Sequence, residues 1–97
     1  MLKKFITYQV SLEFYKMGQS VSMPKHLKDQ FDRASSSVCL NLAEGSARGT
    51  ERDRQRFYRI SFASLRECQS ILELQNSKHE VDLLADRLGA LLYRLCK

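Results

Sequence analysis

The sequence predicts an all-α protein, an up-down-up-down antiparallel four-helix bundle, and three observations predict it. Apolar residues recur at steps of three and four along almost the whole chain, which is the spacing that places them on one face of a helix. One proline and four glycines are too few for a sandwich or barrel with many tight turns. The breaks between the periodic segments are short, and short connections favour helices that pack in alternating directions.

The length of the chain predicts one domain over residues 1–97, built around one core. A chain of this size buries about 60–68% of the surface that it exposes when unfolded. We therefore expect modest stability as a monomer, to which association with further copies would add.

The first helix is expected from Leu2 to about Val21, with apolar residues on two adjacent stripes that indicate a broad buried face. One stripe consists of Val10, Phe14, Met17 and Val21, and the other of Phe5, Tyr8, Leu12 and Tyr15. Pro24 disfavours helical geometry in the residue before it and can open the next helix at its first turn.

The second helix is expected from Lys25 to Glu44. Its buried stripe consists of Phe31, Ala34, Val38, Leu42 and Gly45. The apolar rhythm continues through the serines at 35–37, so these form a small-residue patch on a helix that lets a neighbouring helix approach. Gly45 is expected to end the helix, since glycine adopts left-handed geometry without a clash. A phosphate-binding loop is disfavoured because no second glycine follows at the required spacing.

The third helix is expected from Glu51 to about Gln75, with Thr50 as its N-cap and Asp53 as the partner of that cap. Its stripes are Tyr58, Phe62, Leu65 and Leu72 on one side and Phe57, Ile60, Ser64, Cys68 and Ile71 on the other. A turn is expected at residues 76–78.

The fourth helix carries a coiled-coil-like seam of Val81, Leu84, Leu88, Leu91 and Leu95, which Leu92 widens.

The motifs of common catalytic and cofactor sites are missing from the sequence, so we expect a protein that is not an enzyme and needs no cofactor. Glu44 and Glu73 are candidate acids, but neither has a histidine or carboxylate partner nearby in the sequence. Cys39, Cys68 and Cys96 lack the spacing of a zinc site and are interpreted as small core residues of a reducing compartment. No signal peptide or membrane span is apparent, which favours a cytoplasmic location and no membrane partner.

The most concentrated feature is basic: six arginines, at positions 48, 52, 54, 56, 59 and 66, stand against the two acids Glu51 and Asp53. At 100° per residue, the side chains of Arg52, Arg56, Arg59 and Arg66 project within an arc of about 80° on the third helix. Guanidinium groups at one-turn spacing suit a phosphate backbone, and the net charge of +5 favours a polyanion partner. Two other interpretations stay open. The arginines can form a solvated face paired with Glu80, Asp82 and Asp86, or a subunit interface.

Residues 27–74 carry a resemblance to a known family. The residues that carry it are Leu27, Phe31, Arg33, Ala34 and Val38, then Asn41-Leu42-Ala43-Glu44-Gly45, and, after a basic loop, Arg56-Phe57-Tyr58-Arg59-Ile60-Ser61 and Ser64-Leu65-Arg66-Glu67. In this pattern the chain resembles the four-helix-bundle proteins encoded in intervening sequences of bacterial 23S rRNA genes. Those proteins are related in fold to the accessory proteins of diversity-generating retroelements. Cys39 or Leu40 stands where the family usually has a proline.

The resemblance implies assembly into a ring-like homopentamer, and its retroelement relatives bind RNA and a reverse transcriptase through a basic surface. We therefore expect a homo-oligomeric accessory protein that binds structured RNA without catalysis. Its RNA contacts are expected from Arg48, Arg52, Arg56, Arg59 and Arg66. The alternative is an oligomeric scaffold or adaptor that binds only other proteins.

The motif residues Asn41 and Glu44 lie three apart on one helix face. They are expected to satisfy backbone groups at the Gly45 turn or to pair with Arg48 or Arg59. Direct binding of a ligand is the alternative role for both.

Overall fold

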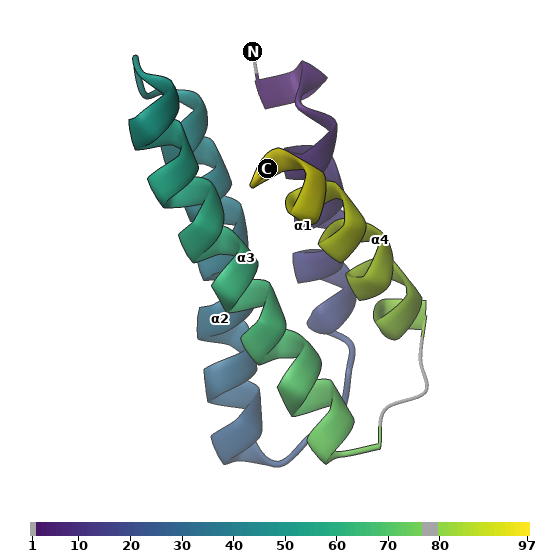
Figure 1. Cartoon of the computed structure of the whole chain (residues 1–97). Coiled ribbons are helices and arrows are strands. Elements are labelled where there is room, and N and C mark those ends of the chain that lie inside the picture. The colour runs from purple at the N-terminus through teal and green to yellow at the C-terminus, as the bar shows by residue number, and fades with distance from the viewer. Residues whose placement is uncertain (1, 77–79) are drawn as a thin grey trace.

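The computed structural model describes residues 2–76 and 80–97 and folds into four α-helices (Figure 1). They are α1 (Ile6–Gly18), α2 (Lys25–Ser46), α3 (Glu51–Leu74) and α4 (Glu80–Leu95), and a 3-10 turn, Leu2–Lys4, precedes them. No strand occurs in either described range. The prediction of an all-α protein with four packed helices is confirmed.

The helices pack as a bundle in which α2 lies between α1 and α3, while α4 closes the other side against α1 and α3 (Figure 1). Apolar side chains from all four helices meet in the core. The Phe14 and Phe31 rings lie 5.9 Å apart between centroids, and Leu42, Leu65 and Leu88 are fully buried around them. The bundle is elongated, with extents of 40 × 21 × 19 Å, so features at its two ends are well separated.

The first helix is shorter than predicted. It begins at Ile6, after Phe5, whose extended backbone and apolar side chain provide no cap, and it ends at Gly18. A Cβ at Gly18 would lie 2.6 Å from the Phe31 ring, so glycine permits close packing there. The second predicted stripe is less buried than expected: Tyr8, Leu12 and Tyr15 are half-buried, although Tyr8 packs against the core. Pro24 is the N-cap of α2 rather than part of its first turn.

The serine patch is helical, as predicted, and brings α2 close to α3. The Ser37 and Ser64 hydroxyls lie 2.8 Å apart across the two helices. The buried Ser61 hydroxyl donates to the Val38 carbonyl at 2.8 Å, and the buried Ser35 hydroxyl bonds within its own helix to the Asp32 carbonyl. Short side chains with satisfied hydroxyls therefore replace bulky apolar ones where the two helices meet.

The prediction that Gly45 ends the second helix was wrong. The helix continues through Ser46, and no glycine of the described residues has a positive φ. A Cβ at Gly45 would lie 2.7 Å from the Tyr58 ring and 3.1 Å from the Phe57 Cβ. Gly45 is thus needed for the approach of α3, and the helix ends where Ala47 and Arg48 donate to the Glu44 and Gly45 carbonyls.

The third helix starts as predicted: the Thr50 hydroxyl accepts from the Asp53 amide at 3.2 Å. Ile60 departs from its predicted stripe and is 42% exposed, because it lies at the outer edge of the face toward α2. At the following turn Asn76 adopts a left-handed φ of 54°, while the predicted turn residues 77 and 78 lie outside the described residues.

The seam of the fourth helix is rotated relative to the prediction. Its most buried residues are Val81, Ala85, Leu88 and Leu92, whereas Leu84, Leu91 and Leu95 are half-buried. Gly89 faces α3, where a Cβ would meet Leu65 and Gln69 only at ordinary contact distances, so the approach of α3 does not depend on this glycine.

Replacing Gly45 with alanine should destabilise the protein by about 1–3 kcal/mol, because the added methyl group overlaps the Tyr58 ring. Gly49→Ala is the matched control: nothing lies within 4 Å of its Cβ position, and its φ is not positive. Urea unfolding measures both, and a Gly45→Ala protein as stable as the control would contradict the close approach described here.

We expect the stability of the protein to depend on pH because the Cys68 thiol is buried. Burial of Cys68, with a smaller contribution from Glu67, raises the pKa of its thiol from 9.0 to about 12. The unfolded chain therefore releases this proton at a lower pH than the folded protein does. The free energy of unfolding should fall between pH 9 and 12, by up to about 1.4 kcal/mol per pH unit from this group.

Chemical unfolding at several pH values checks this prediction. Cys68→Ala should remove the part of the slope that this thiol contributes. The raised pKa of the buried Tyr58 hydroxyl acts in the same direction at higher pH and should persist in the variant. An unchanged slope between pH 9 and 10 in the variant would rule out Cys68 as the source.

Candidate nucleic-acid interface

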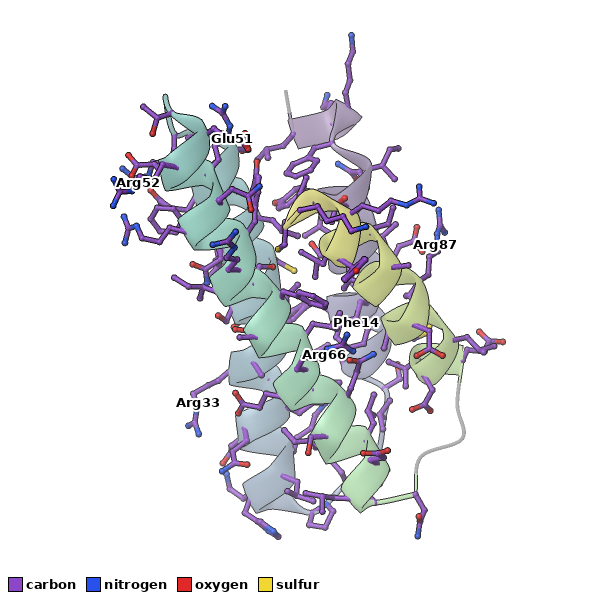
Figure 2. All side chains as sticks on the ribbon, in the orientation of Figure 1. Phe14, Arg33, Glu51, Arg52, Arg66 and Arg87 are labelled. Carbon is purple, nitrogen blue, oxygen red and sulfur yellow. The ribbon has the colours of Figure 1, made fainter. Side chains whose placement is uncertain are left out.

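Three arginines at the start of α3 form an exposed row. Arg52, Arg56 and Arg59 are spaced by four and three residues and, with Asp53, line an open hollow. Arg52 projects into solvent near the first turn of the helix (Figure 2). Neither Arg52 nor Arg59 makes a hydrogen bond or an ion pair with any residue in 2–76 or 80–97. Their guanidinium donors are therefore available to an external acceptor.

Phe57 supports one guanidinium group of this row, that of Arg56, and that of Arg48 beside the row. The Cζ atom of Arg48 lies 4.7 Å from the centroid of the Phe57 ring, and that of Arg56 lies 4.6 Å from it. Such cation–π contacts hold an arginine side chain in place while its edge stays open to other partners. Arg48 also pairs with Glu44, four residues earlier.

Arg54 has a structural role instead. It donates to the Arg48 carbonyl at 3.1 Å and lies 3.6 Å from a Glu51 carboxylate oxygen. These contacts connect the first turn of α3 to the segment that follows α2. The other arginines at this end of α3 are thereby held in a fixed relation to the connecting loop.

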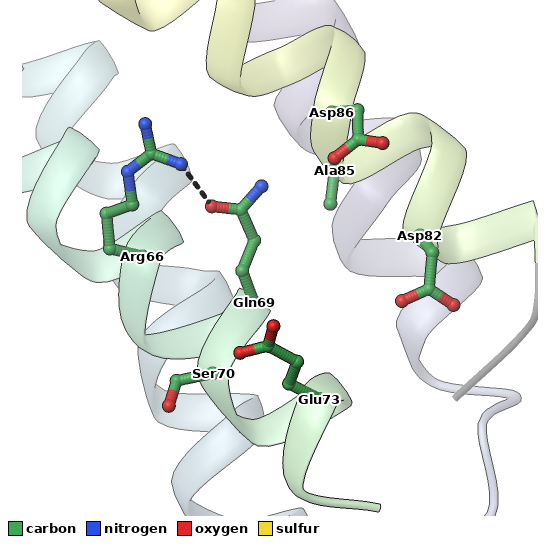
Figure 3. Close-up of a pocket in the computed structure, with 7 residues that line it drawn as sticks. All are labelled: Arg66, Gln69, Ser70, Glu73, Asp82, Ala85 and Asp86. Atoms are coloured by element: carbon green, nitrogen blue, oxygen red, sulfur yellow. Dashed lines mark hydrogen bonds between the residues drawn. The ribbon is translucent and has the colours of Figure 1, made fainter. Parts of the chain in front are cut away.

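Arg66 lies apart from the other arginines. It is seven residues beyond Arg59, about 10 Å further along the helix axis. Its guanidinium stacks on Phe62 at 4.6 Å and donates to Gln69 at 2.8 Å. Figure 3 shows it at the edge of a groove between α3 and α4 whose other residues are Gln69, Ser70, Glu73, Asp82, Ala85 and Asp86. The predicted ridge of four arginines is therefore divided, with Arg66 next to acidic groups.

The motif residues Asn41 and Glu44 make local contacts. The Asn41 amide donates to the Ser37 carbonyl and hydroxyl at 2.9 and 3.0 Å, and so joins the hydroxyl pair between α2 and α3. The sequence analysis expected Asn41 to contact backbone groups at the Gly45 turn. Its actual partner, Ser37, lies one helical turn before Asn41. Glu44 pairs with Arg48, one of its two expected partners. Together with Gly45, these residues support the junction between α2 and α3.

Both chain ends lie beside this junction (Figure 1). Gln55 on α3 donates to the Leu95 carbonyl at 2.7 Å, and the Arg59 charge opposes the rise in the pKa of the Cys96 thiol that burial causes. At the other terminus, Phe5 packs on Tyr58 with ring centroids 6.0 Å apart. Lys4 and Phe5 line a hollow with Ser46 and Tyr58. Basic residues near both termini therefore lie at the same end of the bundle as the α3 arginines, although they are distant in the sequence.

We call this region the basic end. Its cations are Lys3, Lys4, Arg48, Arg52, Arg54, Arg56, Arg59, Arg94 and Lys97, and its carboxylates are Glu44, Glu51 and Asp53. The formal charge of the basic end is therefore +6, from nine cations and three carboxylates. The remaining described residues carry six cations and eight carboxylates, a formal charge of −2. Among the described residues, the net positive charge is thus confined to one end of an elongated bundle.

The sequence analysis did not predict that Arg94, at the end of α4, and Lys97, just after it, belong to the basic end. The available signal was the presence of basic residues near both termini, combined with an even number of helices joined by short connections. Such a bundle brings both termini to the end where the second helix connects to the third.

Other kinds of site find little support in the described part of the chain. Residues 2–76 and 80–97 contain no cluster of three or more histidine, cysteine or acidic side chains able to hold a metal ion. Within the same residues, no helix has both the length and the apolar character needed to cross a membrane.

Comparison with known proteins identifies one family. The model of the 23S rRNA-intervening sequence protein family matches residues 3–92, which include α1, α2, α3 and most of α4. A search of curated proteins finds no match.

Proposed function

The chain belongs to the 23S rRNA-intervening sequence protein family, and on this premise we propose that it is a non-catalytic, homo-oligomeric accessory protein. Its proposed ligand is structured RNA, bound at the basic end. The family description supports a role connected with RNA. The observation that carries the proposal is the separation of charge, with +6 at one end and −2 over the rest of the described chain.

The basic end fits an extended polyanion such as a phosphate backbone better than a small anionic metabolite. Guanidinium groups donate two parallel hydrogen bonds to phosphate oxygens, and several of them at one-turn spacing can follow a phosphate backbone. The hollow of Arg52, Arg56 and Arg59 is open rather than enclosed, so it suits an extended polyanion better than a small molecule. Contacts of this kind recognise shape and charge and carry little sequence information.

Self-association is the second part of the proposal: an up-down-up-down bundle that assembles into a ring of five copies. Large apolar side chains on several helices are exposed in the single chain, including Leu40 at 67% on α2 and Leu83 at 72% on α4. The half-buried stripe of α1 with Tyr8, Leu12 and Tyr15 adds to this surface. Association would cover these side chains and would bring five basic ends into one particle.

The competing function is a protein scaffold or adaptor without a nucleic-acid role. The exposed apolar side chains would serve a foreign protein, such as a reverse transcriptase, as well as a second copy. The charge separation favours RNA, because a neutral protein partner gains little from nine clustered cations.

The triple variant Arg52→Ala, Arg56→Ala, Arg59→Ala should weaken binding to structured ribosomal RNA. Each lost phosphate contact should also lower the slope of log affinity against log salt concentration by about one. Titrations at several salt concentrations between 50 and 200 mM measure both quantities. The oligomeric mass of the same samples shows whether assembly is intact.

The matched control is Arg33→Ala with Arg87→Ala, two exposed arginines that are not part of the α3 row; Figure 2 shows Arg33 on the part of α2 away from Arg52. This control removes positive charge and should leave the affinity nearly unchanged. Equal losses in the two variants would mean that net charge alone drives binding. An unaltered triple variant would rule out the α3 row as the RNA surface.

Leu40→Glu should lower the oligomeric mass of the protein, because it places a charge on an apolar residue that the proposed assembly covers. Gln30→Glu, an exposed polar position on the same helix, is the control and should leave the mass unchanged. Light scattering coupled to size exclusion measures both. A wild-type protein that is monomeric at micromolar concentration would contradict the homo-oligomer.

A further inference from the structure

The boundary between α3 and α4 continues beyond the Arg66 groove toward the basic end, and Tyr93 lies along this boundary on α4. On α4, residues three and four apart share a face. Asp86 lines the groove opposite Arg66, Gly89 approaches Leu65 and Gln69, and Cys96 lies within the electrostatic reach of Arg59. Tyr93 is four residues after Gly89 and three before Cys96. It therefore lies on the edge of α4 that faces α3, between Arg66 and Arg59.

The Tyr93 ring is unusually open for an aromatic side chain in such a small protein, with 54% of the residue exposed. Its contact is with a cation, the Lys97 ammonium, 4.8 Å from the ring centroid. On the facing helix α3, the half-buried Phe62 ring has the Arg66 guanidinium 4.6 Å from its centroid. Each of these rings is therefore paired with a long, flexible and exposed basic side chain.

We propose that Tyr93 is a stacking platform for an unpaired RNA base, with Lys97 and Arg59 binding the flanking phosphates. This inference rests on the proposed RNA-binding function and specifies its ligand: RNA with unpaired nucleotides, rather than a continuous duplex. The bases of a duplex are stacked on one another and present no free face to a side chain. The bases of a loop or bulge can stack on an aromatic ring.

The surroundings of Tyr93 favour RNA over a protein partner. Arg94 follows Tyr93 in the last turn of α4, Lys97 contacts the ring from just beyond the end of the helix, and Arg59 lies on the facing helix. A ring surrounded by cations suits a ligand that combines a flat aromatic group with negative charge. In the absence of such a ligand the Lys97 ammonium can occupy the ring face, and on binding it can move to a phosphate because its stem is flexible.

The test compares two RNAs of equal length, a hairpin with an oligoadenylate loop and a blunt duplex without a loop. Tyr93→Ala should weaken binding to the hairpin on the order of tenfold. It should leave binding to the duplex and the salt slope for both RNAs unchanged, because no charge is removed. Tyr93→Phe keeps the ring and should bind the hairpin like the wild-type protein.

His26→Ala is the matched control: it removes an exposed ring in the first turn of α2, away from the basic end, and should affect neither RNA. An equal loss on both RNAs, or no loss on the hairpin, would overturn the stacking platform. A fall in oligomeric mass in Tyr93→Ala would assign the ring to a contact between copies instead. If the wild-type protein binds neither RNA, the proposed function itself fails; if it binds both and ignores Tyr93, only this inference fails.

Discussion

The close packing of α2 against α3 is the constraint on which the rest of the structure depends. Small residues make it possible: Gly45 leaves room for the Tyr58 ring, and the hydroxyls of Ser37 and Ser64 meet directly. A larger residue at either place would push the helices apart. Because the arginine row lies on the first turns of α3, its position relative to the end of α2 and to the chain termini follows from this contact.

The basic end combines two kinds of arginine with different physical roles. Arg54 and Arg48 are held by a backbone carbonyl, a carboxylate and an aromatic ring, so they order the loop between α2 and α3. Arg52 and Arg59 lack such partners among the described residues and can reorganise around a ligand at low cost. This arrangement suits phosphate binding. The side chains of Arg48 and Arg54 lose their conformational entropy when the protein folds, so only Arg52 and Arg59 lose it when a ligand binds.

The groove between α3 and α4 shows how the two ends of the molecule differ. Glu73, Asp82 and Asp86 line it beside Arg66. Arg59, Lys97 and the Tyr93 ring lie beyond Arg66, nearer the termini. A polyanion would be attracted to that region and repelled from the groove. The same charge separation that favours RNA at the basic end therefore limits how far along the bundle an RNA can extend.

The sequence by itself determined the all-α class, the N-cap at Thr50 and the helical serine patch, because these follow from periodicity and from interactions within a few residues. It also indicated the α3 arginines. Only the tertiary structure decided the role of Gly45, the burial of Ala85, and the placement of Arg66 beside acidic groups and apart from the α3 row. The contribution of Arg94 and Lys97 likewise appeared only there. Each of these depends on which helix faces a residue across the bundle, and that relation is set by packing between segments that are distant in the sequence.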